Sequence, residues 1–351
     1  MTLAIALDAM GGDHAPEVVV AGADLARERN PELHFLMFGD GEQLRALLRG
    51  RNALAARTTI EHTSEAVEAD ARPSQVLRQG RDTSMRLAID AVKDGRASAA
   101  VSAGNTGALM ALAKFVLKTL PGIERPAIAS LMPTRRSETV VLDLGANAEC
   151  DADNLVQFAV MGEVFARAVL GIPQPTVGLL NIGTEDGKGN DTLRDAAAAL
   201  RSSPLPIEFR GFVEGTDLAS GKVDVVVTDG FTGNVALKAA EGAVGLYSQF
   251  LREAFKSSLL SKLGYVLAKP ALQLLRQRLD PRRYNGAMFL GLAGIAVKSH
   301  GSTDAFGFAN AIGVAIDLKV NGFLQKIGDE LARLNAVPAS APADGVVTAS
   351  I

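Results

Sequence analysis

Residues 3–16 read Leu-Ala-Ile-Ala-Leu-Asp-Ala-Met-Gly-Gly-Asp-His-Ala-Pro and place a glycine-rich loop between a strand-like run and the start of a helix. The apolar run that ends at Asp8 is typical of a buried strand, and Pro16 fits the first turn of a helix. Gly11 and Gly12 let backbone N–H groups approach a ligand closely. This order of elements indicates an α/β protein.

Five further glycine-rich loops follow strand-like runs, at residues 102–107, 143–147, 181–190, 228–234 and 298–304. Several of them carry Asp, Asn, His or Lys among the glycines. In an open sheet, ligands bind at the carboxyl ends of the strands. The repetition therefore predicts that the loops together build one anion site.

The remaining elements are read from short apolar runs. Strands are expected at 3–9, 34–38, 59–62, 99–103, 127–132, 140–144, 177–182, 207–212 and 223–228, and a helix at 16–29. In many of these runs apolar and polar residues do not alternate strictly, which is typical of strands that are covered on both faces. We therefore expect a mainly parallel sheet with helices on each side. After Asp229 the pattern predicts only long helices, at 232–268 and 287–334. We expect a single domain over 1–335 and a disordered tail over 336–351.

Composition excludes several classes of protein. The chain has 351 residues, is 48% hydrophobic, and carries a net charge of −3, which argues against a protein that coats nucleic acid. Cys150 is the only cysteine, so intrachain disulfides are impossible and a cysteine metal site is not expected. No signal-like start and no uncharged run of about 18 to 20 residues is present. We expect a cytoplasmic protein that can still touch a membrane surface.

The first two polar loops hold candidate binding residues. Asp8, Gly11, Gly12, Asp13 and His14 form the first, and His14 could hold phosphate or move a proton because its ordinary pKa is near neutrality. The alternative is a plain turn with a helix cap. The second loop is neither a complete Walker A loop nor a dinucleotide fingerprint. It resembles either a phosphate-cradling turn or an ordinary βα turn, and its candidates are Gly104, Asn105, Thr106 and Gly107.

Lys188 is the most suggestive cation, because it lies in a glycine-rich loop among Glu185, Asp186 and Asp191. It would offset the charge of a phosphate or a developing oxyanion, or else form a surface ion pair. Asn234 could donate a hydrogen bond to a carbonyl or merely cap a helix. Further candidates at strand ends are Asn147, Gly183, Asp229, Gly233 and His300, the last more typical of a structural role.

Motifs for covalent hydrolysis are absent. The chain has no Gly-x-Ser-x-Gly elbow and no His-Glu-x-x-His sequence, and Cys150 has no histidine nearby in sequence. An enzyme whose substrate is itself the nucleophile is therefore favoured. Between residues 70 and 94 the chain is helix-compatible and rich in charge. That stretch is either a solvated helical face or a cleft wall that offers arginines to an anionic substrate.

Residues 252–283 are basic and amphipathic. Eight positive and two negative side chains give this segment +6. An apolar stripe at helical spacing comprises Phe255, Leu259, Leu260, Leu263, Val266 and Leu267. Such a helix packs on the core or on a partner subunit, or its apolar residues and Lys262 contact a membrane or an acyl carrier protein, since both of these partners are acidic.

The glycine-rich blocks at residues 8–16, 102–108, 183–190, 228–235 and 298–301 resemble, in order, the signature blocks of the PlsX family of phosphate acyltransferases. The resemblance extends from residue 8 to about 315. It implies a three-layer α/β/α fold similar to isocitrate and isopropylmalate dehydrogenases and phosphotransacetylases. It also implies transfer of a fatty acyl group from acyl carrier protein to inorganic phosphate, which gives an acyl phosphate for glycerophospholipid synthesis.

Further expectations follow from the resemblance. It implies a homodimer without nicotinamide or metal, located in the cytoplasm and at the inner face of the membrane, and supplying a glycerol-3-phosphate acyltransferase that consumes the acyl phosphate. Lys188 and Asn234 are carried over as catalytic contacts, and His14 as a third candidate. The alternatives are a short-chain phosphate acetyl- or butyryltransferase that uses coenzyme A, an NAD-linked dehydrogenase, and a membrane-associated scaffold without catalysis.

Overall fold

A computed structural model describes residues 3–203, 207–278 and 280–336, and the expected tail falls almost wholly outside them. The described chain forms one sheet of eleven strands in the order β3-β2-β1-β4-β11-β10-β5-β6-β9-β7-β8. Seven of its ten strand pairings are parallel. The expectation of a mainly parallel sheet is confirmed.

The sheet consists of two parallel groups. One contains β1 (Ala4–Asp8), β2 (His34–Gly39), β3 (Thr58–His62), β4 (Ala99–Ser102) and β11 (Ile295–Lys298). The other contains β6 (Glu138–Leu142), β7 (Thr176–Leu180), β8 (Glu208–Val213) and β9 (Val225–Val227). Between them, β10 (Ala287–Leu290) and β5 (Ala127–Pro133) pair antiparallel to each other and to their outer neighbours. The two groups therefore run in opposite directions.

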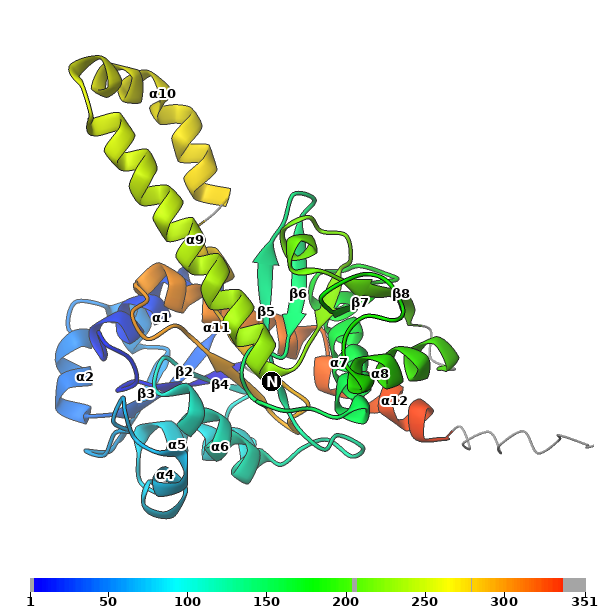
Figure 1. Ribbon diagram of the computed structural model, residues 1–351. Coiled ribbons are helices and arrows are strands. Elements are labelled where there is room, and N and C mark those ends of the chain that lie inside the picture. Colours follow the sequence, from blue (N-terminus) through cyan, green and yellow to red (C-terminus); the bar gives the residue numbers. More distant parts are fainter. Residues whose placement is uncertain (1–2, 204–206, 279, 337–351) are drawn as a thin grey trace, which may run out of the picture.

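Helices cover both faces of the sheet, as Figure 1 shows, because strand side chains alternate between two apolar cores. Ile5 and Leu7 face one core, and Ala6 faces the other. The first core is covered by α1 (Glu17–Arg29), α2 (Gly41–Leu48), α3 (Asn52–Ala55), α7 (Ala152–Val169), α8 (Asp191–Ser202), α11 (Ala305–Val320) and α12 (Phe323–Ala336). The second is covered by α4 (Pro73–Gln79), α5 (Ser84–Lys93), α6 (Thr106–Leu117), η1 (Gly215–Ala219) and the start of α9 (Gly230–Lys256).

The region after residue 229 differs from the expectation of helices alone. β10 and β11 lie in the middle of the sheet, where 287–334 was expected to be helical. These strands have only four residues each and flank a glycine-containing turn at 291–294. A short apolar run cannot be identified as helix or strand by its periodicity. Here hydrogen bonding to the neighbouring strands β5 and β4 determines that both runs form strands.

A helical hairpin projects from the body of the molecule (Figure 1). It consists of α9 and α10 (Leu259–Arg278), and only Gly230 and Gly233 of α9 are buried. The 27 residues of α9 give it a length of about 40 Å. The expected continuous stripe is wrong at Phe255, since α9 ends at Lys256, and this ring instead packs edge-on against Tyr265 of α10, 5.4 Å between centroids.

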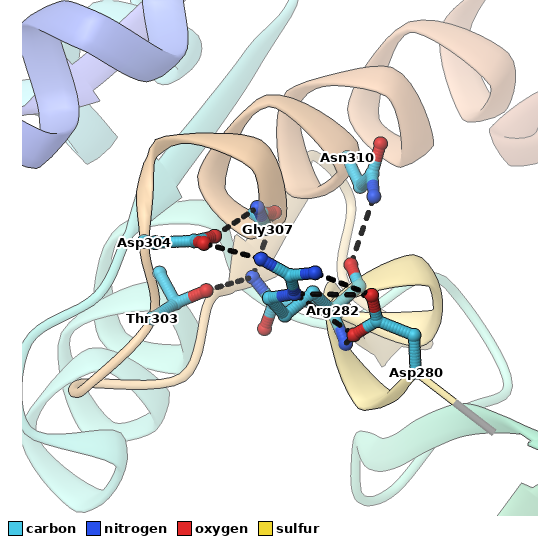
Figure 2. Close-up of polar contacts among 7 residues, drawn as sticks. Asp280, Arg282, Thr303, Asp304, Gly307 and Asn310 are labelled. Carbon is cyan, nitrogen blue, oxygen red and sulfur yellow. Dashed lines mark hydrogen bonds and ion pairs between the residues drawn. The ribbon is translucent and has the colours of Figure 1, made fainter. Parts of the chain in front are cut away.

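The base of the hairpin is fastened to α11 through Arg282 of η2 (Pro281–Tyr284), as Figure 2 shows. Its guanidinium donates to Asp280 (Nε to Oδ1, 2.9 Å) and to Asp304 (Nη1 to Oδ2, 2.6 Å). Asp304 also caps α11 by accepting from the Gly307 amide, and Asn310 donates to the Arg282 carbonyl. The charge of Arg282 is thus already paired inside the chain.

Candidate functional site

The six glycine-rich loops separate into two groups. Those after β1, β4 and β11 leave one edge of the sheet, and those after β6, β7 and β9 leave the opposite edge, because the two sets of strands run in opposite directions. Hydrogen bonds connect the three loops of the first group and, in the second group, the loops after β6 and β9. Among the described residues no hydrogen bond joins the two groups. The expectation that all six line one site is therefore corrected to two groups.

Asp8 is the centre of the first group. Its side chain is 1% exposed and accepts hydrogen bonds of 2.6 Å from the hydroxyls of Ser84 and Ser102. Burial raises the pKa of Asp8, although these bonds act in the opposite direction. A Cβ on Gly11 would lie 2.3 Å from the Asp8 carboxylate, so only glycine fits there. Asp8 thus holds the loops in place.

Lys298 ends β11 and begins the sixth glycine-rich loop, but it was not predicted to be a site residue. Its amine is buried and donates to the carbonyls of Ala103 (3.3 Å) and Ser299. Burial lowers the pKa of Lys298 to about 8, against the opposing effect of Asp8 and Asp13. Ser84 was also missed, because it lies 76 residues from Asp8 and no local pattern connects them.

The other predicted residues of this group lie on its rim. Asp13 and His14 are exposed, and the Asp13 amide donates to the Gly301 carbonyl. The ring of His300 is exposed and hydrogen-bonds with Ser302. Asn105 caps α6 by accepting from the Ala108 amide. Gly12 and Gly104 lie in the same two loops, and Thr106 and Gly107 are the first residues of α6.

Asp143 is the centre of the second group, and it was not selected from the sequence either. Its carboxylate is fully buried and accepts from the amides of Ile128 (2.8 Å), Ala146 (3.0 Å) and Asn147 (2.7 Å). Burial raises the pKa of Asp143 despite these donors. The side chain of Asn147 donates to Asp143 and to the Pro126 carbonyl, so it supports the loop.

Asn234 lies in the first turns of α9, against the loop that Asp143 holds. Its Nδ2 donates to the Leu144 carbonyl at 3.0 Å, so one of its two amide hydrogens is used. A Cβ on Gly233 would lie 1.9 Å from the Asp143 carbonyl oxygen, which requires glycine at this approach. Asp229 caps α9 by accepting from the Thr232 amide. Asn234 is therefore not the helix cap.

Lys188 lies in the loop between β7 and α8. Its side chain is exposed, and no ion pair or hydrogen bond to its amine occurs within the described part of the chain. Asp186 and Asp191 pair with Arg201 and Arg194 instead. Since β7 and β9 are neighbours in the sheet, the Lys188 loop and the start of α9 leave the same edge. Gly183 begins this loop, and a Cβ there would contact the Lys188 side chain.

The structure therefore brings Lys188 and Asn234 to one edge and places His14 in the other group. Cys150 lies near Asp143, and burial raises the pKa of its thiol to about 11, so the thiol stays protonated at neutral pH. Over the described ranges, no cluster of three or more His, Cys, Asp or Glu side chains could hold a metal ion.

The hairpin exposes its predicted contact residues. Leu259, Leu260, Leu263 and Leu267 are each more than half exposed, and Lys262 is exposed beside them. Packing on the core of the same chain is thereby excluded for these side chains. In the part of the chain that the structure describes, no helix is both long and apolar enough to cross a membrane.

Comparison with known proteins adds independent information. A family model described as "Fatty acid synthesis protein" matches residues 3–326. A phosphate acyltransferase from Rhodospirillum centenum is 69% identical over 95% of this chain and 94% of its own length. Another from Rhodospirillum rubrum is 62% identical over 97% of both chains.

Solved structures share the fold at low sequence identity. A phosphotransacetylase from Streptococcus pyogenes superposes with a TM-score of 0.61 at 19% identity, over 91% of this chain and 94% of the other. The EutD phosphotransacetylase from Staphylococcus aureus gives a TM-score of 0.57 at 18% identity over the same shares. The three-layer arrangement expected from the sequence is thus confirmed.

Proposed function

The chain belongs to the PlsX family of phosphate acyltransferases, and we propose that acyl carrier protein is the fatty acyl donor for the reaction at the edge that carries Lys188 and Asn234. As a member of this family the chain is a transferase that moves an acyl group to inorganic phosphate for phospholipid synthesis. The observation that carries the site proposal is that Lys188 has no ion partner among the described residues and lies at the edge of the sheet where α9 begins.

Phosphate is proposed to bind between Lys188 and the start of α9. The N-terminus of a long helix favours anions, because its first N–H groups have no partner in the helix and the helix dipole is positive there. The exposed ammonium group of Lys188 adds a full positive charge at the same edge. Asp186 and Asp191 do not neutralise it, since each pairs with an arginine.

Asn234 is proposed to orient the acyl carbonyl. The Leu144 carbonyl uses one hydrogen of its amide, which fixes the side chain and leaves the second hydrogen available as a donor. A donor held in this way stabilises a tetrahedral oxyanion without reorganisation during the reaction. Gly145 allows the approach, since a Cβ there would lie 3.0 Å from Asn234 Nδ2.

The chemistry then needs no protein nucleophile. A phosphate oxygen, already anionic near neutral pH, attacks the thioester carbon and forms the tetrahedral oxyanion. The C–S bond breaks, the thiolate leaves and takes up a proton from solvent, and the acyl phosphate remains. A thiol with a pKa of about 8.5 is a tolerable leaving group. Catalysis rests on holding two reactants together and on stabilising the oxyanion.

Two further roles remain proposals. Substrate binding by the first group, including His14 and His300, is supported by the exposed polar rim of its loops. The exposed leucines and Lys262 of the hairpin are proposed to contact an anionic membrane surface, where a glycerol-3-phosphate acyltransferase would receive the acyl phosphate. A homodimer is also proposed, because α9 exposes Tyr247 and Phe250 to solvent.

The decisive experiment incubates the purified protein with long-chain acyl-acyl carrier protein and phosphate. We expect phosphate-dependent release of thiol and equimolar formation of acyl phosphate. Turnover with short acyl coenzyme A alone would assign the phosphotransacetylase-type reaction instead. Inactivity with both donors would contradict the proposed function and favour a scaffold, and a nicotinamide-dependent absorbance change would indicate a dehydrogenase.

A further inference from the structure

An apolar groove lies between α4 and α6, outside the site described above. It encloses about 490 Å³ and is lined by Leu77, Met110, Ala111 and Phe115. The Phe115 ring is 53% exposed, which is unusual for a large aromatic side chain on a helix that packs against the core. The groove thus offers an apolar surface that no other part of the described chain covers.

The rim of the groove is positively charged. Lys118 Nζ lies 4.9 Å from the centre of the Phe115 ring, and Lys114 is one helical turn away. Neither amine has a carboxylate within ion-pair distance among the described residues, whereas the nearby Arg86 pairs with Asp90. In a chain whose net charge is −3, this is a local excess of positive charge.

Lys118, the C-cap residue of α6, has an unfavourable backbone conformation. Its φ of 64° and ψ of 174° fall in a region that glycine occupies almost exclusively, at a cost of about 1–3 kcal/mol for other residues. It is the one non-glycine residue with a positive φ in the described ranges. Glycine would adopt this conformation without strain, so a lysine stands at a helix end where the backbone alone would favour glycine.

The groove and the Lys188–Asn234 site lie at the same edge of the sheet. The Lys118 carbonyl accepts from the Ala293 amide in the turn between β10 and β11. β10 ends at this turn. The first residue of β5, Ala127, pairs with the last residue of β10, and β6 ends beside the start of β5. Two strand spacings, about 10 Å, therefore separate the turn from the end of β6, which leads to Asp143.

We propose that this groove is the docking surface for the acyl carrier protein, which would lay an apolar helix face against Phe115 and direct carboxylates to Lys114 and Lys118. This inference rests on the proposed donor. An acidic protein fits the concave apolar floor and the two unpaired lysines, and it would present its acyl chain at the edge where the reaction is placed. A flat membrane surface suits the projecting hairpin better than a recessed groove.

The test compares steady-state kinetics of three variants with the wild type. Lys114→Glu/Lys118→Glu is expected to raise the KM for acyl-acyl carrier protein at least about tenfold, with kcat and the KM for phosphate unchanged. Lys118→Gly should raise the same KM while leaving the melting temperature equal or higher, because it relieves the backbone strain. Lys319→Glu/Lys326→Glu, with the same change in charge on the opposite face, should match the wild type.

Each other outcome separates the possibilities. An unchanged KM in the groove variants would overturn the docking surface while the proposed function stood. An equal rise in the Lys319/Lys326 control would overturn it as well, since only overall charge would then matter. A changed mass of the groove variants in light scattering would identify the groove as a subunit contact. A wild type that makes no acyl phosphate would instead contradict the proposed function.

Discussion

Asn234 and Gly233 show how single residues determine what the site can do. Gly233 lets the start of α9 approach the Asp143 carbonyl so closely that no side chain fits. Asn234 is then held by the Leu144 carbonyl, with one amide hydrogen still available. An alanine at 234 would remove this donor and little packing, because the side chain is only partly buried.

We expect Asn234→Ala to lower kcat by about 100-fold to 1000-fold, since loss of one oxyanion donor has this effect in other enzymes. Initial rates of acyl phosphate formation would measure the change, and thermal unfolding would check that the variant is folded. Asn52→Ala, an exposed asparagine on α3, is the matched control. Wild-type turnover in Asn234→Ala would show that the proposed role is wrong.

Lys298 predicts a pH dependence of stability. Its pKa is lowered to about 8 from 10.5, so between these values the unfolded chain binds more protons than the folded one. Stability from this residue is therefore present above pH 10.5 and is lost as the pH falls through 8. We expect the wild type to gain about 2 kcal/mol over Lys298→Met between pH 7.5 and 9.5.

Urea unfolding of both proteins at the two pH values measures this difference, and other titrating groups cancel in the comparison. A difference that stayed constant with pH would mean that Lys298 titrates like an exposed lysine. Asp8 was predicted from the sequence, but Ser84 and Lys298 were not, because both come from segments that are distant from Asp8 in the chain. The pairing of β1, β4 and β11 brings Lys298 near Asp8, and the packing of α5 on β1 and β4 brings Ser84 there.

At the scale of elements, the α9–α10 hairpin is amphipathic, and no other element of the described chain covers its exposed apolar side chains. Leu263 is 58% exposed and Leu267 is 77% exposed, although both lie on a helix. Complete burial of one such leucine side chain against a partner would stabilise the complex by roughly 1.5–3 kcal/mol. The exposed face therefore favours an external partner.

Leu263→Glu should weaken flotation with anionic liposomes, because a charge replaces an apolar side chain at the expected contact. Gln273→Glu adds the same charge at an exposed polar position of α10 and is the matched control. Equal flotation of the wild type and Leu263→Glu would contradict a membrane role for this face. Circular dichroism would establish that both variants keep their helices.

At the scale of the whole molecule, the projecting hairpin favours association of two chains. Its first helix also exposes Tyr247 (59%) and Phe250 (57%), which a second copy would cover. Exposed apolar residues on this scale mark interfaces in soluble proteins. The dimer and the extent of the single domain stay predictions.

Multi-angle light scattering should give twice the 36.6 kDa mass of one chain. Tyr247→Glu/Phe250→Glu is expected to shift the population towards the monomer, because two charges would have to be buried in the interface. Gln249→Glu on the same helix is the control. A wild type that stays monomeric at micromolar concentration would refute the dimer.

The sequence by itself determined the strand–loop–helix units and their polar loops, because apolar runs and glycines act locally. It also carried the family resemblance, since the glycine blocks occur in order along most of the chain. It did not reveal that β10 and β5 reverse the direction of half the sheet, which places His14 on one edge and Lys188 with Asn234 on the other. Strand direction and order depend on pairing between distant segments, and local periodicity contains no information about such pairing.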